Sequence, residues 1–393
     1  MSNNLPFEIQ TEIIKRLPVK SLIQFRSVSK SWKSLIESVD FIVRYNAQQT
    51  QLQHLVIRYY DNFISVVDDD TFPLRKVHVT IPWCVKWYNF FWIVGCSNGL
   101  MGLYGYCREG CGGPNSRTGM AVIWNLSIRK AVAVVVPYVK NQMIYENVLG
   151  FGVCRETSDP KIVKITQINS LEATESITCI PSQVEVFTLT TKAWRNSYGN
   201  LPRKSIKFGD SKVVIEGVLY WLAIDRIKLD GEFVFYNLVI SFDMTSEEFK
   251  EINLPDTLAH NHHNLHISNL LNSLVVLESH VYSNDPVSVV WMMKDGVPKS
   301  FTKLFAINFH TGHASLRGFR KSGAPIVALA EDGRLLLVVY EPYAKHIDDF
   351  WIHGGKYSFL VYPYVKSLLL LDQPDHIVYN DISKWKAKNK RLM

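Results

Sequence analysis

The chain has 393 residues, of which 47% are hydrophobic and 20% charged, a composition typical of a folded globular protein and not of a disordered one. Six cysteines are too few for a disulfide-stapled secreted fold, and apolar runs such as 131–136 are far shorter than the roughly 18 residues that a membrane helix needs. The net charge of +7 lies at the two ends, with +3 in residues 1–50, +5 in residues 384–393 and −1 in the remainder, so the body lacks the clustered Lys and Arg of a nucleic-acid-binding surface.

The first 45 residues predict three short helices. Pro6 suits the first turn of a helix, which ends at Pro18 and whose apolar residues recur every four positions: Ile9, Ile13 and Leu17. A second apolar segment covers residues 22–28, and Ser29 can cap a third helix that continues to about residue 39. Nothing in residues 1–6 resembles the start of a secretory signal, so we expect a protein of the cytoplasm, the nucleus or both.

This helical unit carries more apolar side chains than three short helices can hide from water. Two explanations are open. The surplus side chains either dock on the domain that follows or form a surface that another protein covers.

Residues 5–36 resemble the F-box, the segment that binds the Skp adaptor of cullin-based ubiquitin ligases. The similarity rests on the segments LP at 5–6, LPVKSL at 17–22, FR at 25–26 and VSKSW at 28–32, with Ser29 where many members have Cys. It implies a Skp-type adaptor, and through it a cullin scaffold, as partners. It also implies that the following residues contact the adaptor: Leu5, Pro6, Ile9, Ile13, Leu17, Pro18, Leu22, Val28, Lys30 and Trp32.

From about residue 50 the pattern becomes strand-like, with short β-branched and aromatic runs between Gly, Asn, Asp and Pro. Two elements recur at intervals of about 54 to 65 residues. One is a strand, turn and strand, centred on Asn125, Thr188, Asp243, Asn308 and Tyr362. The other is a turn before an apolar strand, at Gly99, Gly217, Ser273 and Gly333. This period favours a β-propeller of five or six kelch-like blades, with a large irregular barrel as the alternative.

The same region resembles the F-box-associated, kelch-like domain of the large plant F-box family. The clearest segments are GCSNGLMGL at 95–103, IWNLSIRK at 123–130 and YVKSLLLLD at 364–372. We therefore expect a mainly β protein with three parts: an F-box over residues 1–45, a target-binding propeller over residues 50–380, and a basic tail over residues 381–393.

Metal and cofactor sites are not expected. A His-rich run (His260, His262, His263 and His266) and the pair Cys107 and Cys111 lack the further ligands that a zinc site needs, so solvated loops explain them better. The run Asp68, Asp69 and Asp70 is typical of a solvated turn. The tail is either a frayed terminus or a nuclear-localisation patch.

The resemblance implies the substrate-recognition subunit of an SCF-type (Skp-cullin-F-box) ubiquitin ligase, which holds an unidentified target protein and performs no bond chemistry itself. Known hydrolase, nucleotide-binding and zinc-protease signatures are absent. The alternatives are an F-box adaptor or competitor that acts without ubiquitination, and a propeller enzyme. Candidate target anchors, which core packing would also explain, are Trp83, Trp87, Tyr88, Phe90 and Trp92.

Overall fold

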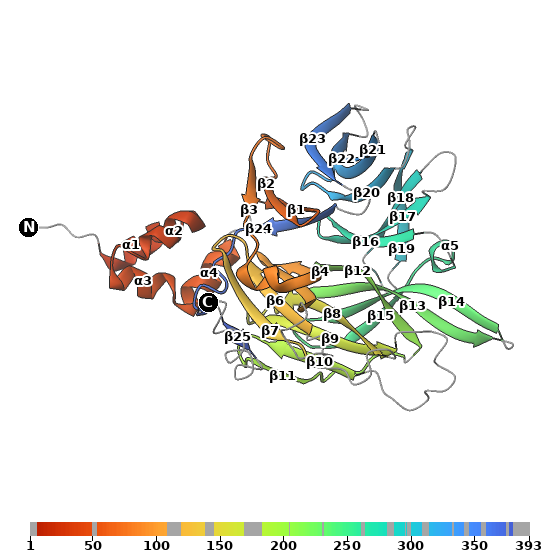
Figure 1. Cartoon of the computed structure of the whole chain (residues 1–393), viewed down its shortest axis with the longest axis horizontal. Coiled ribbons are helices and arrows are strands. Elements are labelled where there is room, and N and C mark those ends of the chain that lie inside the picture. Colours follow the sequence, from red (N-terminus) through yellow and green to blue (C-terminus); the bar gives the residue numbers. More distant parts are fainter. Residues whose placement is uncertain are drawn as a thin grey trace, which may run out of the picture.

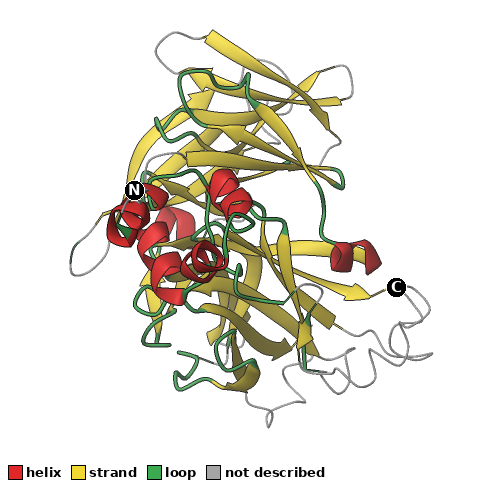
Figure 2. Ribbon diagram, turned by 90° about the vertical axis from the view of Figure 1, so that its left-hand side faces the viewer, coloured by secondary structure: helices red, strands yellow, loops and turns green. Residues whose placement is uncertain are grey.

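The computed structural model places four helices at one end of a β-propeller (Figure 1). In Figure 2, which views the molecule from the helical side, the helices lie in front of the strands and cover only part of them. The structure describes residues 6–48, 53–107, 119–137, 145–168, 183–203, 205–229, 232–260, 264–280, 287–294, 296, 300–308, 314–331, 334–341, 346–354, 359–374 and 377–379.

The helical unit (residues 7–48) consists of α1 (Phe7–Ile14), α2 (Val19–Phe25), α3 (Lys30–Ile36) and α4 (Val39–Gln48). The predicted cap is confirmed, because the Ser29 hydroxyl accepts a hydrogen bond from the Trp32 amide at 3.1 Å. The prediction of three helices was wrong. The third helix ends at Ile36, and Ser38 starts a fourth, since its hydroxyl accepts a hydrogen bond from the Phe41 amide at 3.3 Å.

Six antiparallel sheets form the blades of the propeller, at the upper end of the predicted number. The strands of each blade are named below from the innermost to the outermost. Blade one is β24 (Leu360–Val365), β1 (Gln53–Tyr59), β2 (Asn62–Val67) and β3 (Lys76–Val79). Blade two is β4 (Tyr88–Ser97), β5 (Leu100–Cys107), β6 (Gly119–Asn125) and β7 (Lys130–Val135). Blade three is β8 (Tyr145–Val153), β9 (Pro160–Ile168), β10 (Gln183–Thr188) and β11 (Ala193–Asn196).

Blade four is β12 (Ile206–Ile215), β13 (Val218–Leu229), β14 (Glu232–Asp243) and β15 (Phe249–Asn253). Blade five is β16 (Asn264–Leu270), β17 (Ser273–His280), β18 (Val287–Lys294) and β19 (Ser300–Asn308). Blade six is β20 (Ala314–Phe319), β21 (Pro325–Glu331), β22 (Arg334–Glu341) and β23 (His346–Gly354). The short elements η1 (Trp83–Trp87) and α5 (Asp256–Ala259) precede blades two and five, and β25 (Val378–Tyr379) adds a parallel edge strand to β7.

The ring closes through blade one, which combines strands from both ends of the propeller sequence. The inner strand β24 pairs antiparallel with β1, from Gln53 opposite Val365 to Arg58 opposite Leu360. The pairing removes two sheet edges that would otherwise stay open.

The first repeated element is the turn between the third and fourth strands of blades two, three and four. A side-chain oxygen starts each turn: Asn125 Oδ1 accepts from the Ser127 amide at 2.9 Å, and Asp243 Oδ1 from the Thr245 amide at 2.7 Å. The Thr188 hydroxyl accepts from the amide one position further along, that of Thr191, at 3.4 Å. Four residues after each of them the backbone turns left-handed, at Arg129, Lys192 and Glu247. Asn, Thr and Asp are thus interchangeable here, because each accepts a backbone hydrogen bond that starts the turn.

Two of the five predicted members of this element were wrong. Asn308 ends β19, the fourth strand of blade five, and Tyr362 lies inside the innermost strand β24. Of the second element, Gly99, Gly217 and Ser273 stand at first-to-second strand turns, as one repeat requires. Gly333 lies outside the described residues, between the second and third strands of blade six.

A C-terminal strap (residues 366–374) fastens the helical unit to the propeller. Its leucines at 368–371 are buried in one core with Leu22, Ile36 and Tyr45 of the helices. The Leu368 amide donates to Asn46 Oδ1 at 3.0 Å. On the propeller side, buried Asn125 donates from Nδ2 to the carbonyls of Ser367 (3.0 Å) and Leu369 (2.7 Å).

Buried ion pairs tie neighbouring blades together. Glu247 of blade four accepts hydrogen bonds from Lys161 Nζ at 2.9 Å and Arg195 Nη1 at 2.8 Å, both in blade three. Between blades one and six, the Asp68 carboxylate accepts from Arg320 Nε at 2.9 Å and from the Lys321 amide at 2.6 Å. The prediction of a solvated turn at residues 68–70 was therefore wrong for Asp68, whose side chain is fully buried.

Replacing Asn125 with Ala should lower the free energy of unfolding by about 2–4 kcal/mol, because two buried carbonyls of the strap lose their donor. Urea unfolding measures the change. Asn62→Ala, at an exposed position at the start of β2, is the matched control and should cost under about 0.5 kcal/mol. Equal stability of the two variants would contradict the role given to Asn125.

Glu247 should make stability depend on pH. Burial raises the pKa of its carboxyl, but hydrogen bonds from Arg195 and Lys161 outweigh burial and hold the pKa below the usual 4.5. The stabilisation is therefore complete above pH 4.5 and is lost as the pH falls through the lower pKa of the folded state. Glu247→Gln should be less stable than the parent by about 3 kcal/mol at pH 7, and the gap should close in acid. Urea unfolding from pH 7 to pH 3 tests this, and a constant gap would refute it.

Candidate functional site

The helical unit has one covered side and one bare side. Ile14, Leu22, Ile36 and Tyr45 point into the core shared with the strap. In contrast, Ile9, Ile13 and Val28 keep 49%, 51% and 61% of their surface exposed. Ile9 and Ile13 are four residues apart on α1, so their side chains lie side by side along the helix. Apolar groups concentrated on so small a unit are typical of a protein-binding surface.

Side-chain contacts fix the four helices relative to one another. Trp32 Nε1 of α3 donates to Gln10 Oε1 of α1 at 3.0 Å, and the Trp32 ring packs 5.3 Å from the Phe25 ring. The Tyr45 hydroxyl of α4 donates to the Leu17 carbonyl at 2.9 Å. The surface is therefore formed before any partner binds, which lowers the entropy cost of association.

A second candidate surface lies at the opposite end of the molecule. Strands β13 and β14 pair over twelve residues and form a hairpin that projects away from the helices (Figure 1). Its side chains Ile224, Phe233 and Phe235 are exposed, and the Arg226 guanidinium lies 3.3 Å from the centre of the Phe233 ring. Sequence analysis missed this hairpin, although two long β-branched and aromatic runs joined by Asp230 and Gly231 were a signal for it.

Two of the predicted target anchors, Trp92 and Trp83, differ in exposure. Trp92 is 39% exposed and packs on the rings of Tyr104 and Tyr106, whereas Trp83 is half-buried. Trp87, Tyr88 and Phe90 belong to described elements, but their side chains lie outside the described part.

The described residues contain no group of three or more His, Cys, Asp and Glu side chains that could hold a metal ion. His266 lies in β16, and the His260 ring contacts the ring of Tyr236 at 4.7 Å. His262, His263 and Cys111 lie outside the described residues. Within the same part of the chain, none of the helices has the length and apolar character needed to cross a membrane.

Comparison with known families places both parts of the chain. The F-box domain matches residues 2–44, and the F-box associated beta propeller domain matches residues 114–369. The chain belongs to the F-box proteins with an F-box associated β-propeller. The helical unit is therefore its F-box.

Curated relatives from Arabidopsis thaliana are similar over most of their length. F-box protein At3g07870 is 24% identical, covering 94% of this chain and 93% of the relative. F-box protein CPR1 is 26% identical, covering 77% and 73%. Among solved structures, the β-propeller domain of the trilobed protease from Pyrococcus furiosus is 16% identical with a TM-score of 0.34, covering 72% and 73%.

The structure distributes the predicted adaptor contacts of the F-box over three environments. Pro6, Ile9, Ile13, Pro18, Val28 and Lys30 are exposed, Leu17 and Trp32 are partly buried, and Leu5 lies outside the described residues. Leu22 differs from all of them, because its side chain is fully buried under the strap. We therefore assign Leu22 to the core; Phe7, at the start of α1, is a further exposed apolar side chain of the F-box.

Core and surface positions in the F-box should separate in stability measurements. Leu22→Ala should cost about 3 kcal/mol, because it leaves a cavity in the shared core. Ile13→Ala should cost under about 1 kcal/mol, because the Ile13 side chain is half exposed. Urea unfolding of both variants tests the assignment. A larger loss for Ile13→Ala than for Leu22→Ala would reverse it.

Proposed function

We propose that this F-box protein is the substrate-recognition subunit of an SCF-type ubiquitin ligase. Its F-box would bind a Skp-type adaptor, and through it a cullin scaffold, while its propeller holds a target protein. The supporting observation is the exposed apolar group of Ile9, Ile13 and Val28 on an F-box whose other side is already covered. Such an assembly operates in the cytoplasm or the nucleus.

Adaptor binding draws its free energy from this group. Burying an exposed Ile or Val side chain yields about 1.5–3 kcal/mol when it is complete. Ile9 and Ile13 on α1 and Val28 after α2 would enter an apolar groove of the adaptor, with Pro6, Leu17, Pro18 and Trp32 around them and Lys30 as a polar contact at the edge. Because the strap holds the F-box against the propeller, the adaptor would fix the direction of the whole receptor.

The propeller contributes position and no chemistry of its own in this proposal. A target lysine that is held close to a ubiquitin thioester reacts faster because its effective concentration rises. The β13–β14 hairpin suits target binding, since Phe233 and Phe235 are exposed at the end of the molecule away from the F-box (Figure 1). Exposed aromatic side chains often dominate the energy of such interfaces.

The double variant Ile9→Asp with Ile13→Asp should weaken binding of a Skp adaptor about 100-fold, because two apolar contacts are lost and two carboxylates must be desolvated. Calorimetric titration of purified adaptor into the full-length protein measures the affinity. Leu271→Asp is the matched control, because Leu271 is 65% exposed on blade five, far along the chain from the F-box, and should change the affinity less than twofold. A folded double variant with unchanged affinity would contradict the proposed surface.

Target turnover distinguishes a ligase receptor from an F-box protein that acts without ubiquitination. Proteins captured by the full-length chain should become ubiquitinated when adaptor, cullin and conjugating enzyme are added. Phe233→Asp with Phe235→Asp should reduce that ubiquitination and leave adaptor binding intact. Capture without ubiquitination would support the second role.

A further inference from the structure

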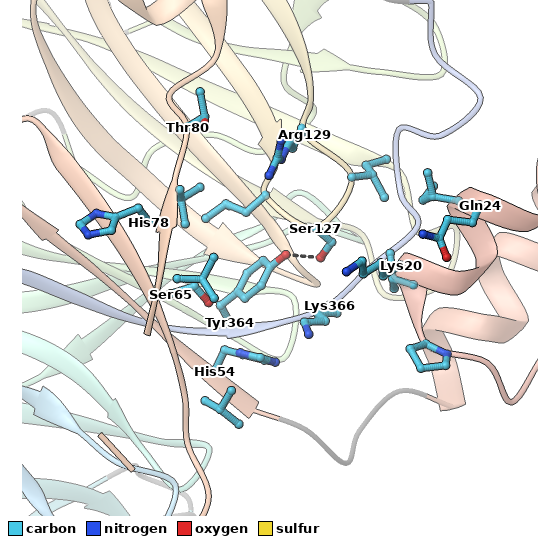
Figure 3. Close-up of a pocket in the computed structure, with 18 residues that line it drawn as sticks. Lys20, Gln24, His54, Ser65, His78, Thr80, Ser127, Arg129, Tyr364 and Lys366 are labelled. Atoms are coloured by element: carbon cyan, nitrogen blue, oxygen red, sulfur yellow. Dashed lines mark hydrogen bonds between the residues drawn. The ribbon is translucent and has the colours of Figure 1, made fainter. Parts of the chain in front are cut away.

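A cavity of about 580 Å³ lies at the junction between the F-box and the propeller. Its walls come from three separated parts of the chain: the start of α2, the strands of blade one, and the β6–β7 turn of blade two. Figure 3 shows Lys20, from the F-box side, and Lys366, from the start of the strap, near the Ser127 and Tyr364 hydroxyls. We call this cavity the basic pocket.

The charge of the basic pocket is unbalanced. Its lining includes the cations Lys20, Arg129 and Lys366. Among the described residues the lining includes no Asp or Glu, and none of the three cations forms an ion pair with a described residue. The carboxylates of Asp68 and Asp69, which interact electrostatically with His54, already pair with Arg320 and Arg75. All three cationic side chains are exposed to solvent and are therefore accessible to a ligand.

A buried polar atom in the same place also lacks a partner. His54 is 4% exposed, and its Nε2 makes no hydrogen bond to any described residue. The ring packs edge-on against Tyr364, 6.2 Å between centres, which holds it at the wall of the pocket (Figure 3). An unsatisfied buried nitrogen costs free energy that a bound ligand atom would recover.

Neutral hydroxyls and apolar side chains complete the lining. Ser127 and Tyr364 hydrogen-bond to each other through their hydroxyls, and Ile23, Val79 and Ile128 form apolar walls. The volume lies in the range of small-molecule sites, about 300–1,000 Å³. The pocket therefore offers an apolar surface for a carbon skeleton and several separated cations for anionic groups.

We propose that the basic pocket binds a small organic molecule with two or more phosphate groups, which Lys20, Arg129 and Lys366 hold against His54 and Tyr364. One cation belongs to the F-box and two to the propeller or its strap. The ligand would therefore bridge the two parts of the receptor and strengthen their attachment. This inference does not depend on adaptor binding.

Calorimetric titration of the full-length protein, without adaptor, with pyrophosphate and with ATP tests the proposal. Both probes carry adjacent phosphate groups, so at least one should bind with a Kd below about 100 µM and more weakly as salt is added. Lys20→Gln and Lys366→Gln should each weaken binding at least tenfold. Lys250→Gln, on the exposed strand β15 of blade four, is the matched control and should change the Kd less than twofold.

Three results would overturn the proposal. Neither probe binds the wild-type protein; the control variant loses as much affinity as the pocket variants; or a phosphoserine peptide binds while both small probes fail, which would make the pocket a peptide site. The unfolding midpoint of each Gln variant should match the wild type without ligand, which shows that lost affinity does not reflect lost folding.

Discussion

The burial of four consecutive leucines, residues 368–371, is the interaction on which the two-part structure depends. Each fully buried leucine contributes about 1.5–3 kcal/mol, and these four lie between the helices and blade two. The same stretch of chain begins with β24, which closes the propeller ring against β1. Residues 360–374 therefore complete both the propeller and the core of the F-box, although they lie more than 300 residues from the helices in sequence.

The strap divides the apolar surplus of the F-box into two sets. Leu22, Ile36 and Tyr45 pack inward and serve folding, while Ile9, Ile13 and Val28 are exposed to water. Docking on the following domain thus accounts for one set, and the exposed set is the surface proposed for a partner. The division also creates a junction between F-box and propeller, and the cations of the basic pocket gather there.

Side-chain hydrogen bonds within the turns made the repeating blades predictable from the sequence. Asn125, Thr188 and Asp243 repeat because each starts the same turn with a side-chain oxygen, so their spacing revealed the blades. The spacing misled at Asn308 and Tyr362, because loop lengths in the later blades differ and no local signal fixes the register. The burial of Leu22 and of Asp68 was not readable, because the strap that covers the first and Arg320 that pairs with the second come from distant segments. Ser38 before Phe41 was a readable sign of the fourth helix.

Hydrogen–deuterium exchange of the full-length protein, with and without a Skp adaptor, tests the central claim most directly. In the free protein the amides of 39–46 and 368–371 should already exchange slowly, since Leu368 donates to Asn46 and the strap is buried. Adding adaptor should slow exchange in 7–14 and around Val28 and leave the strap unchanged. Rapid exchange of 368–371 in the free protein, or protection by adaptor that appears on the strap and not on α1, would contradict the account.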